Sequence, residues 1–160
     1  MRRARGAIGM WRPGAQVRGV VLVTALWLAL AAGTAGAAAP PGSVYAFGNN
    51  YYGQLGSPAN NGTGNANPTP TLVSLAGQSG PVTEIAAGTD HSLALTASGQ
   101  LYAFGSNHEG ELGIPTNSGT NNPNSMPALV SLPGQSGQVT EIAAGGKDSL
   151  ADREWPAVRL

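Results

Sequence analysis

The feature that most constrains this chain is an internal duplication. Residues 44–94 and residues 101–151 align without a gap at an offset of 57, and 33 of the 51 aligned positions are identical. Self-similarity at a period of this length is typical of repeat architectures, in which each unit buries its apolar surface against its neighbours. The middle of the chain, residues 40–151, is therefore a tandem repeat, with units at residues 44–100 and 101–151.

Each unit carries strand and turn signals. Short runs rich in β-branched, aromatic and small apolar residues are separated by Gly, Pro, Ser and Asp, which favour tight turns. In the first unit these runs occupy residues 72–75, 82–87, 91–96 and 100–104. Because the connections are hairpin-sized and leave no room for crossover helices, the sequence predicts an all-β fold in which residues 72–104 form a four-stranded antiparallel sheet.

The same assignment of strands predicts partial sheets before and after the four-stranded sheet. Residues 44–47 would be a lone strand, and an unfinished sheet would contain residues 128–132, 139–144 and 148–151. Leucines alternate with small residues along residues 91–96, a mixture that suits a sheet packed on both faces in a crowded radial array.

The repeat resembles that of the regulator of chromosome condensation family. The residues that carry the resemblance are 86–88, 91–95, Gly99, Tyr102, Phe104, Gly105, Asn107 and 110–113, and in the earlier copy Tyr45, Phe47, Gly48, Asn50 and 53–56. The resemblance covers residues 44–151 and implies a β-propeller, usually seven-bladed, that acts by binding proteins. This chain would supply about two repeats, a partial propeller of four-stranded antiparallel blades. The periods and signature dipeptides of tryptophan–aspartate and kelch propellers do not fit.

The first 39 residues have the pattern of a secretory signal peptide. Residues 1–19 contain five arginines and no acidic residue, residues 20–32 are apolar apart from one threonine, and A-x-A cleavage sites follow at residues 35–37 and 37–39. This pattern predicts a helical leader and a product that is secreted, at the cell surface or periplasmic. The alternative is a membrane anchor, but the apolar run is shorter than the roughly 20 residues that span a bilayer.

Without the leader, the chain is acidic. The formal net charge of zero hides an asymmetry, because residues 44–150 contain six acidic residues and only one basic residue, Lys147. Nucleic acids and anionic membranes are bound through Lys and Arg, so both are disfavoured as partners. The chain has no cysteine, which excludes disulfides and thiol chemistry.

The sequence contains no constellation that predicts catalysis, a cofactor or a metal site. His91 stands between Asp90 and Ser92, but neighbouring residues on a strand point to opposite faces, so His91 is expected to cap the turn where its strand begins. Residues 57–71 and 114–127 are rich in Asn, Gly, Pro and Thr and contain no carboxylate, which disfavours a calcium site. These two inserts are interpreted either as permissive surface loops or as partner-binding loops.

Differences between the copies point to a binding surface. Tyr51 and Tyr52 align with His108 and Glu109 in the second copy, although their surroundings are nearly identical. Tyrosine provides a large amphipathic contact area at low entropic cost, which suits a binding anchor. We therefore expect Tyr51, Tyr52, His108 and Glu109 to contact a protein partner, on a surface shared with the two inserts.

Repetition stops within a strand, and residues 152–160 form a non-repeat tail. The resulting interpretation is an exported, non-catalytic, protein-binding propeller scaffold that is a fragment of a longer one. Exposed sheet edges predict marginal stability or edge-to-edge self-association. Three alternatives remain: a secreted enzyme inhibitor, like a β-lactamase-inhibiting propeller that resembles this family; a nonfunctional truncated product; and guanine-nucleotide exchange, which export disfavours.

Overall fold

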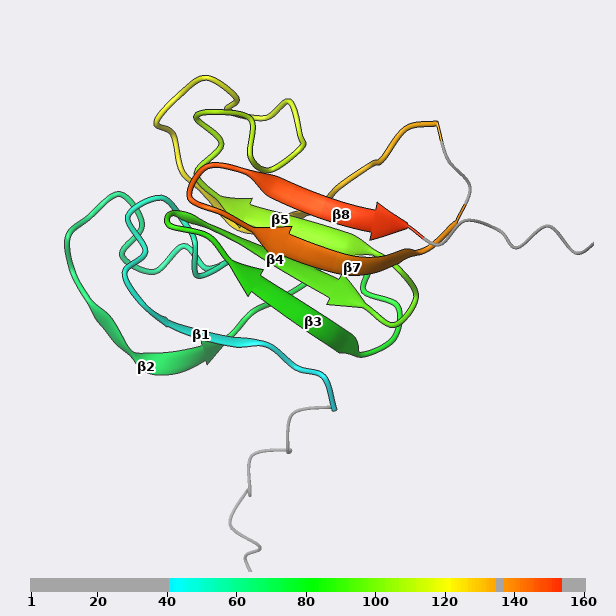
Figure 1. Cartoon of the computed structure of the whole chain (residues 1–160). Coiled ribbons are helices and arrows are strands. Elements are labelled where there is room, and N and C mark those ends of the chain that lie inside the picture. Colours follow the sequence, from blue (N-terminus) through cyan, green and yellow to red (C-terminus); the bar gives the residue numbers. More distant parts are fainter. Residues whose placement is uncertain (1–40, 135–136, 154–160) are drawn as a thin grey trace, which may run out of the picture. The chain divides into compact units, whose positions relative to one another are not determined.

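The computed structural model describes residues 41–134 and 137–153, so the predicted leader and the end of the tail lie outside the described residues. All regular elements in the described part are β-strands (Figure 1). In chain order they are β1 (Tyr45–Gly48), β2 (Asn67–Leu72), β3 (Val82–Ala87), β4 (His91–Thr96), β5 (Leu101–Gly105), β6 (Asn124–Leu129), β7 (Val139–Ala144) and β8 (Ser149–Arg153). No helix in this part is long and apolar enough to cross a membrane.

The strands form three antiparallel sheets. The middle sheet is a four-stranded meander in the order β3-β4-β5-β6, and two-stranded sheets β1-β2 and β7-β8 stand before and after it in the chain. β7 packs against β3 and β4 of the middle sheet (Figure 1). The predicted all-β class, with four-stranded antiparallel blades, is confirmed.

The predicted position of the four-stranded sheet was wrong. The sheet spans Val82–Leu129 rather than residues 72–104, because β2 pairs with β1 and not with β3. Residues 44–47 are consequently no lone strand, and β6 belongs to the middle sheet instead of the last one. Each insert, predicted as a loop, contributes the outer strand of its sheet.

The outer strands escaped prediction because of their composition. β2 reads NPTPTL and β6 reads NSMPAL, and proline within a run argues against a central strand. An outermost strand hydrogen-bonds on one side only, so a missing N–H on the other side costs nothing. Val73 and Leu75, which looked like strand residues, are buried in the connection between sheets.

The two inner strands of the middle sheet, β4 and β5, are buried on both faces. Leu101 and Ala103 of β5 belong to a core cluster with Val139 and Ile142 of β7. The alternate residues Tyr102 and Phe104 point the other way, into a second cluster whose members from the preceding connection are Val73 and Leu75. Since successive side chains of a strand face opposite sides, β5 packs against β7 with one face and against the preceding connection with the other.

Tyr102 shows how closely consecutive units fit together. Its side chain is 1% exposed, and its hydroxyl donates a hydrogen bond of 2.9 Å to the carbonyl oxygen of Ala76. Nearby, a side chain at Gly56 would collide with Val73 and press on the ring of Phe104, and Gly56 also has a φ of +65°. Glycine is required there because backbone and aromatic ring meet at van der Waals distance.

Candidate partner-binding site

The loops that follow β1 and β5 are built on a buried asparagine. The Asn107 side-chain amide donates to the carbonyl oxygens of Ile114 and Thr116 at 2.8 Å each, and its oxygen accepts from the Leu112 N–H at 3.0 Å. Asn50 makes the same three contacts one repeat earlier, at 2.7–2.9 Å. Both side chains are fully buried. A single residue thus closes each loop and fixes the residues that follow it.

Each insert is also ordered by its own network of asparagine hydrogen bonds, and the two networks are equivalent. Asn117 adopts a φ of +55° and donates to the side-chain oxygen of Asn124 at 3.0 Å, and Asn124 donates to the Gly105 carbonyl at 3.1 Å. Asn60 and Asn67 repeat this arrangement in the first copy at 3.0 and 3.2 Å. Asparagine tolerates the left-handed conformation better than other side chains, which accounts for its abundance in these segments.

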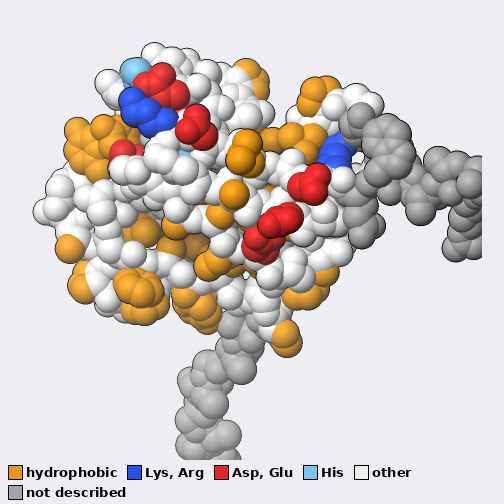
Figure 2. Space-filling model, in the orientation of Figure 1, with side chains coloured by type: hydrophobic (Ala, Val, Ile, Leu, Met, Phe, Trp, Pro, Cys, Tyr) orange, Lys and Arg blue, Asp and Glu red, His pale blue; other side chains and the backbone are white. Residues whose placement is uncertain are grey.

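A pocket of about 220 Å³ lies where the loops from one end of the three sheets meet. Its lining residues are Tyr52, Asp90, Ser106, His108, Glu109, Glu111, Asn121, Gly146 and Lys147. These residues come from the loops after β1 and β5, from the turns β3–β4 and β7–β8, and from the second insert. Acidic, basic and histidine side chains are visible together at one corner of the surface (Figure 2).

The structure brings three of the four predicted binding residues to this pocket. Tyr52, His108 and Glu109 line it. Tyr51 is 45% exposed and packs edge-on against Tyr52, with ring centroids 4.9 Å apart. Their role in binding stays a prediction.

Sequence reasoning missed the other side chains of the pocket, chiefly Asp90, Glu111 and Lys147. A signal for two of them existed, because Asp90 aligns with Lys147 and so differs between the copies. What could not be read was that turns from three sheets converge at one end. That convergence depends on which strands belong to which sheet, and the prediction from the sequence assigned them incorrectly.

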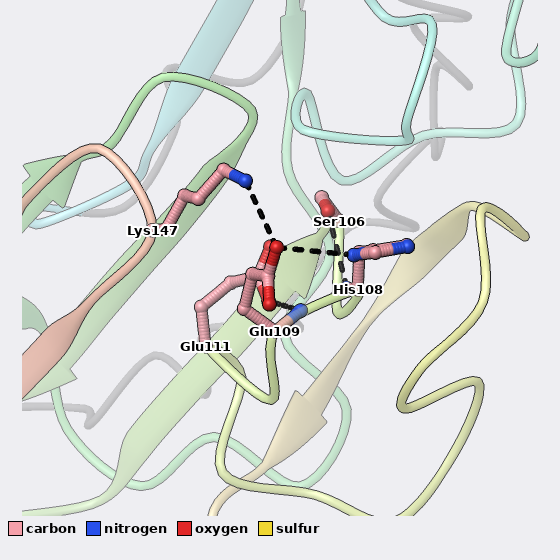
Figure 3. Close-up of polar contacts among 5 residues, drawn as sticks. All are labelled: Ser106, His108, Glu109, Glu111 and Lys147. Atoms are coloured by element: carbon pink, nitrogen blue, oxygen red, sulfur yellow. Dashed lines mark hydrogen bonds and ion pairs between the residues drawn. The ribbon is translucent and has the colours of Figure 1, made fainter.

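The charges of the pocket form a small network around Glu109 (Figure 3). Its Oε1 lies 2.8 Å from Lys147 Nζ and 3.3 Å from His108 Nδ1. The hydrogen bond from Lys147, followed by that from His108, lowers the pKa of Glu109, and the same contact with Glu109 raises the pKa of Lys147. All three side chains are at least 44% exposed, so the network orients groups toward solvent more than it stabilises the fold.

Glu111 supports this network from below. Its Oε2 accepts a hydrogen bond of 2.8 Å from the Glu109 backbone N–H, and the residue is 7% exposed. Burial by itself raises the pKa of Glu111, but hydrogen bonds from Ser106 and from backbone amides outweigh burial, and the net pKa is lowered. A buried, ionised carboxylate therefore holds the Glu109 backbone in place.

His91 joins two sheets. It is 1% exposed, and its Nε2 lies 2.9 Å from Ser149 Oγ of β8. Ser92 points elsewhere, donating to the Gln54 carbonyl at 2.8 Å, so His91 pairs with Ser149 and not with Ser92. A Cβ at Gly88 would collide with the imidazole, which explains the glycine there. The predicted turn-closing role holds for the backbone, where the His91 carbonyl accepts from the Gly88 N–H at 2.9 Å.

Metal ligation has no support within residues 41–134 and 137–153, where no three His, Asp or Glu side chains come close enough to hold an ion. The pocket's chemistry is that of molecular recognition: aromatic surface, one cation, several carboxylates and turn backbone.

Comparison with known proteins identifies the repeat. The family model "Regulator of chromosome condensation (RCC1) repeat" matches residues 41–95 and 98–151, and a second model of the same description matches residues 82–111. The chain belongs to the RCC1 repeat family. The resemblance stated from the motifs is thereby confirmed.

Relatives containing RCC1 repeats include proteins of different kinds. The chain is 45% identical to Protein RCC1 of Candida albicans over 76 residues, which are 46% of this chain and 16% of that protein. It is 42% identical over 74 residues to the E3 ubiquitin-protein ligase MYCBP2 of Danio rerio, covering 46% of this chain and 2% of the ligase. This chain thus spans only a small part of these relatives.

A solved structure confirms the architecture. Prp20p of Saccharomyces cerevisiae is 25% identical and superposes with a TM-score of 0.60, covering 70% of this chain and 27% of Prp20p. In propeller terms the middle sheet is a complete RCC1-type blade, while β1-β2 and β7-β8 correspond to its last two and first two strands, as the 57-residue offset requires.

Proposed function

We propose that this RCC1-repeat chain is a non-catalytic scaffold that binds a protein partner through the pocket of Tyr52, His108, Glu109 and Lys147. The observation that carries the proposal is the convergence of copy-divergent residues from three successive sheets on one pocket. Most residues of the strands are the same in both copies, whereas every residue that lines this pocket differs from its counterpart, so the pocket is free to encode specificity. Protein binding is also known for Prp20p, which binds Gsp1p and histones.

The chemistry of the pocket suggests what a partner presents. Asp90, Glu109 and Glu111 outnumber Lys147, and the Tyr51–Tyr52 pair lies beside them. A basic side chain flanked by apolar surface would pair with the carboxylates and cover the tyrosine rings. Tyrosine anchors at the centre of an interface commonly contribute more than about 1 kcal/mol each to binding.

Affinity capture with matched variants tests this proposal. Proteins retained by the immobilised wild-type chain would be compared with those retained by the double variant Tyr51→Ala/Tyr52→Ala. The exposed residue Glu141 lies on β7, outside the pocket, and Glu141→Ala serves as control. We expect a partner that is kept by the control, is lost from the double variant and binds again with measurable affinity when purified. Retention of the same proteins by both variants would contradict the assignment of the pocket.

We further propose that the chain acts outside the cytoplasm after its leader is removed. The support is the arginine-rich start, the apolar run and the small-residue sites at residues 35–39. N-terminal sequencing of exported material should begin just after residue 37 or 39. Exported protein that begins at Met1 would contradict this proposal without affecting the binding pocket.

A further inference from the structure

Two strand edges at opposite ends of the array carry exposed apolar side chains. β1 pairs with β2 on one side and β8 pairs with β7 on one side, and among the described residues neither has a strand on its other side. Tyr45 and Phe47 of β1 are 50% and 63% exposed, and Leu150 of β8 is 70% exposed. Unpaired edges with apolar side chains are templates for strand addition.

The chain contains an internal template for what these two edges would do together. β1 reads YAFG, which is identical to residues 102–105 of β5, and Ser149–Ala151 of β8 repeat Ser92–Ala94 of β4. β4 and β5 pair antiparallel, with Ser92 opposite Phe104, Leu93 opposite Ala103 and Ala94 opposite Tyr102. Strands with the same sequences as the β8 and β1 edges therefore already pair antiparallel in this molecule, as β4 and β5.

The side chains of the template also predict a receiving pocket. Tyr102 and Phe104 of β5 pack in one core cluster with Val73 and Leu75 of the preceding unit, close to Gly56. The residues one repeat later are Gly113, Val130 and Leu132. These three line a pocket of about 580 Å³ beside β8, together with Leu150 and Ala151. The pocket thus has the lining that accepts a Tyr and a Phe elsewhere in the same structure.

We propose that a second copy of this chain inserts its β1 edge into this pocket. β8 of one copy and β1 of the next would pair antiparallel with the template's register: Ser149 opposite Phe47, Leu150 opposite Ala46 and Ala151 opposite Tyr45. The result is a four-stranded sheet, β7-β8-β1-β2, in which the Tyr45 hydroxyl donates to the Pro133 carbonyl as Tyr102 donates to Ala76.

The opposite face of this junction is matched as well. In the template, Leu93 packs in one cluster with Leu112 and Ile142. Their counterparts at the junction are Leu150 of one copy with Leu55 and Ile85 of the next, and Ile85 is 63% exposed in the single chain. Leu55 and Ile85 line a pocket of about 340 Å³ beside β1 that is positioned to receive the leucine.

Three positions of the β8 edge depart from the template, since Asp148, Asp152 and Arg153 stand where His91, Leu95 and Thr96 are buried. At Asp152 a carboxylate replaces an apolar side chain of the core cluster. Partial burial of that charge weakens the junction relative to the internal β4–β5 pair. Replacing it with the template residue, Asp152→Leu, should tighten association.

Head-to-tail contacts of this kind close into rings when the rotation between units permits. Each copy brings one complete blade and completes one shared blade, so every ring has an even number of blades. Propellers have about four to eight blades, which corresponds to two to four copies. This interface adjoins the binding pocket of the proposed function, since Glu109, Glu111 and Lys147 line both pockets. Phe47 and Leu150, the residues changed in the test below, do not line the binding pocket, so the two proposals are tested separately.

Sedimentation velocity of the purified full-length chain and two edge variants tests the proposal. Phe47→Asp disables the β1 edge and Leu150→Asp disables the β8 edge, and both residues are exposed in the single chain, so each variant should fold. Met126→Asp on β6, at 64% exposure, is the matched control away from the junction. Circular dichroism verifies the fold of each variant.

We expect the wild type and the control to sediment as a ring of two to four copies at tens of micromolar, and each edge variant alone to sediment as a monomer. Mixing the two variants should produce a 1:1 dimer, because the intact β8 edge of Phe47→Asp can accept the intact β1 edge of Leu150→Asp, leaving one junction. A monomeric wild type would overturn the proposal, as would association that both edge variants retain.

Discussion

The two copies of the repeat share two thirds of their residues, 33 of 51 aligned positions, but have very different surroundings. Phe104 is 2% exposed and its counterpart Phe47 is 63% exposed; Tyr102 is 1% exposed and Tyr45 is 50% exposed. The cause is position in the array: Phe104 packs on a preceding unit, and Phe47 has no such unit among the described residues. In an array of sheets the neighbour decides burial, whereas the repeat sequence supplies only the complementary shapes.

The largest effect that could break this comparison is truncation of the two phenylalanines. Phe104→Ala removes a buried ring and should cost about 3–5 kcal/mol of unfolding free energy, whereas Phe47→Ala should cost less than about 0.5 kcal/mol in the monomer. Urea unfolding at low protein concentration measures both. Equal losses for the two variants would mean that the copies are equally buried.

The loop asparagines should behave in the opposite way, because both are buried and both make the same three hydrogen bonds. Asn50→Ala and Asn107→Ala each leave two carbonyls and an amide without their partner. We expect losses of about 2–3 kcal/mol for each variant, with similar values in the two copies. A large difference between the two variants in urea unfolding would show that loop order, too, depends on the neighbouring sheet.

A smaller effect separates the tyrosines. Tyr102→Phe deletes the hydroxyl that donates to the Ala76 carbonyl and should cost about 1 kcal/mol. Tyr45→Phe is the matched control, since that side chain is half exposed, and it should leave the stability of the monomer unchanged. If Tyr102→Phe were neutral in thermal unfolding, the hydrogen bond between units would contribute nothing.

The smallest expected effect is pH-dependent and concerns His91. Burial lowers the pKa of His91 below its ordinary value of 6.5, against the opposing influence of Glu111, Asp90 and Asp148. The folded chain therefore binds fewer protons at this site than the unfolded chain, so its contribution to stability falls as pH decreases through 6.5.

Unfolding at pH 7.5 and pH 5.5 measures this decrease. The decrease in unfolding free energy between these pH values should disappear in His91→Gln. It should persist in His108→Gln, which changes the only other histidine of the chain. The same pH dependence in both variants would assign the effect to other groups.

Much of this fold could be predicted from the sequence, since strong local signals mark the central strands. The runs at residues 82–87, 91–96 and 100–104 match β3, β4 and β5 closely, because β-branched, aromatic and small apolar residues bounded by turn residues are typical of strands. β2 and β6 contain proline and asparagine and hydrogen-bond only as outer strands, so their local pattern is that of a loop. Because these two outer strands were predicted as loops, the four-stranded sheet was assigned to the wrong set of strands.

The candidate site was predictable only where the copies differ. Tyr51, Tyr52, His108 and Glu109 stood out because the duplication provides its own reference. Lys147 and Glu109 are 38 residues apart in the sequence, and the loops that carry them belong to two different sheets. Such a contact depends on how sheets stack, which local sequence patterns do not encode.

The comparison between copies can be tested with the only two phenylalanines in the chain, Phe47 and Phe104. Fluorine NMR of protein labelled with fluorophenylalanine should give two resonances at a concentration where the chain is monomeric. A soluble paramagnetic agent should broaden the Phe47 resonance and leave that of Phe104 sharp, with Phe47→Leu used for assignment. Equal broadening of the two resonances would contradict the claim that neighbouring sheets, rather than the repeat sequence itself, decide which residues are buried.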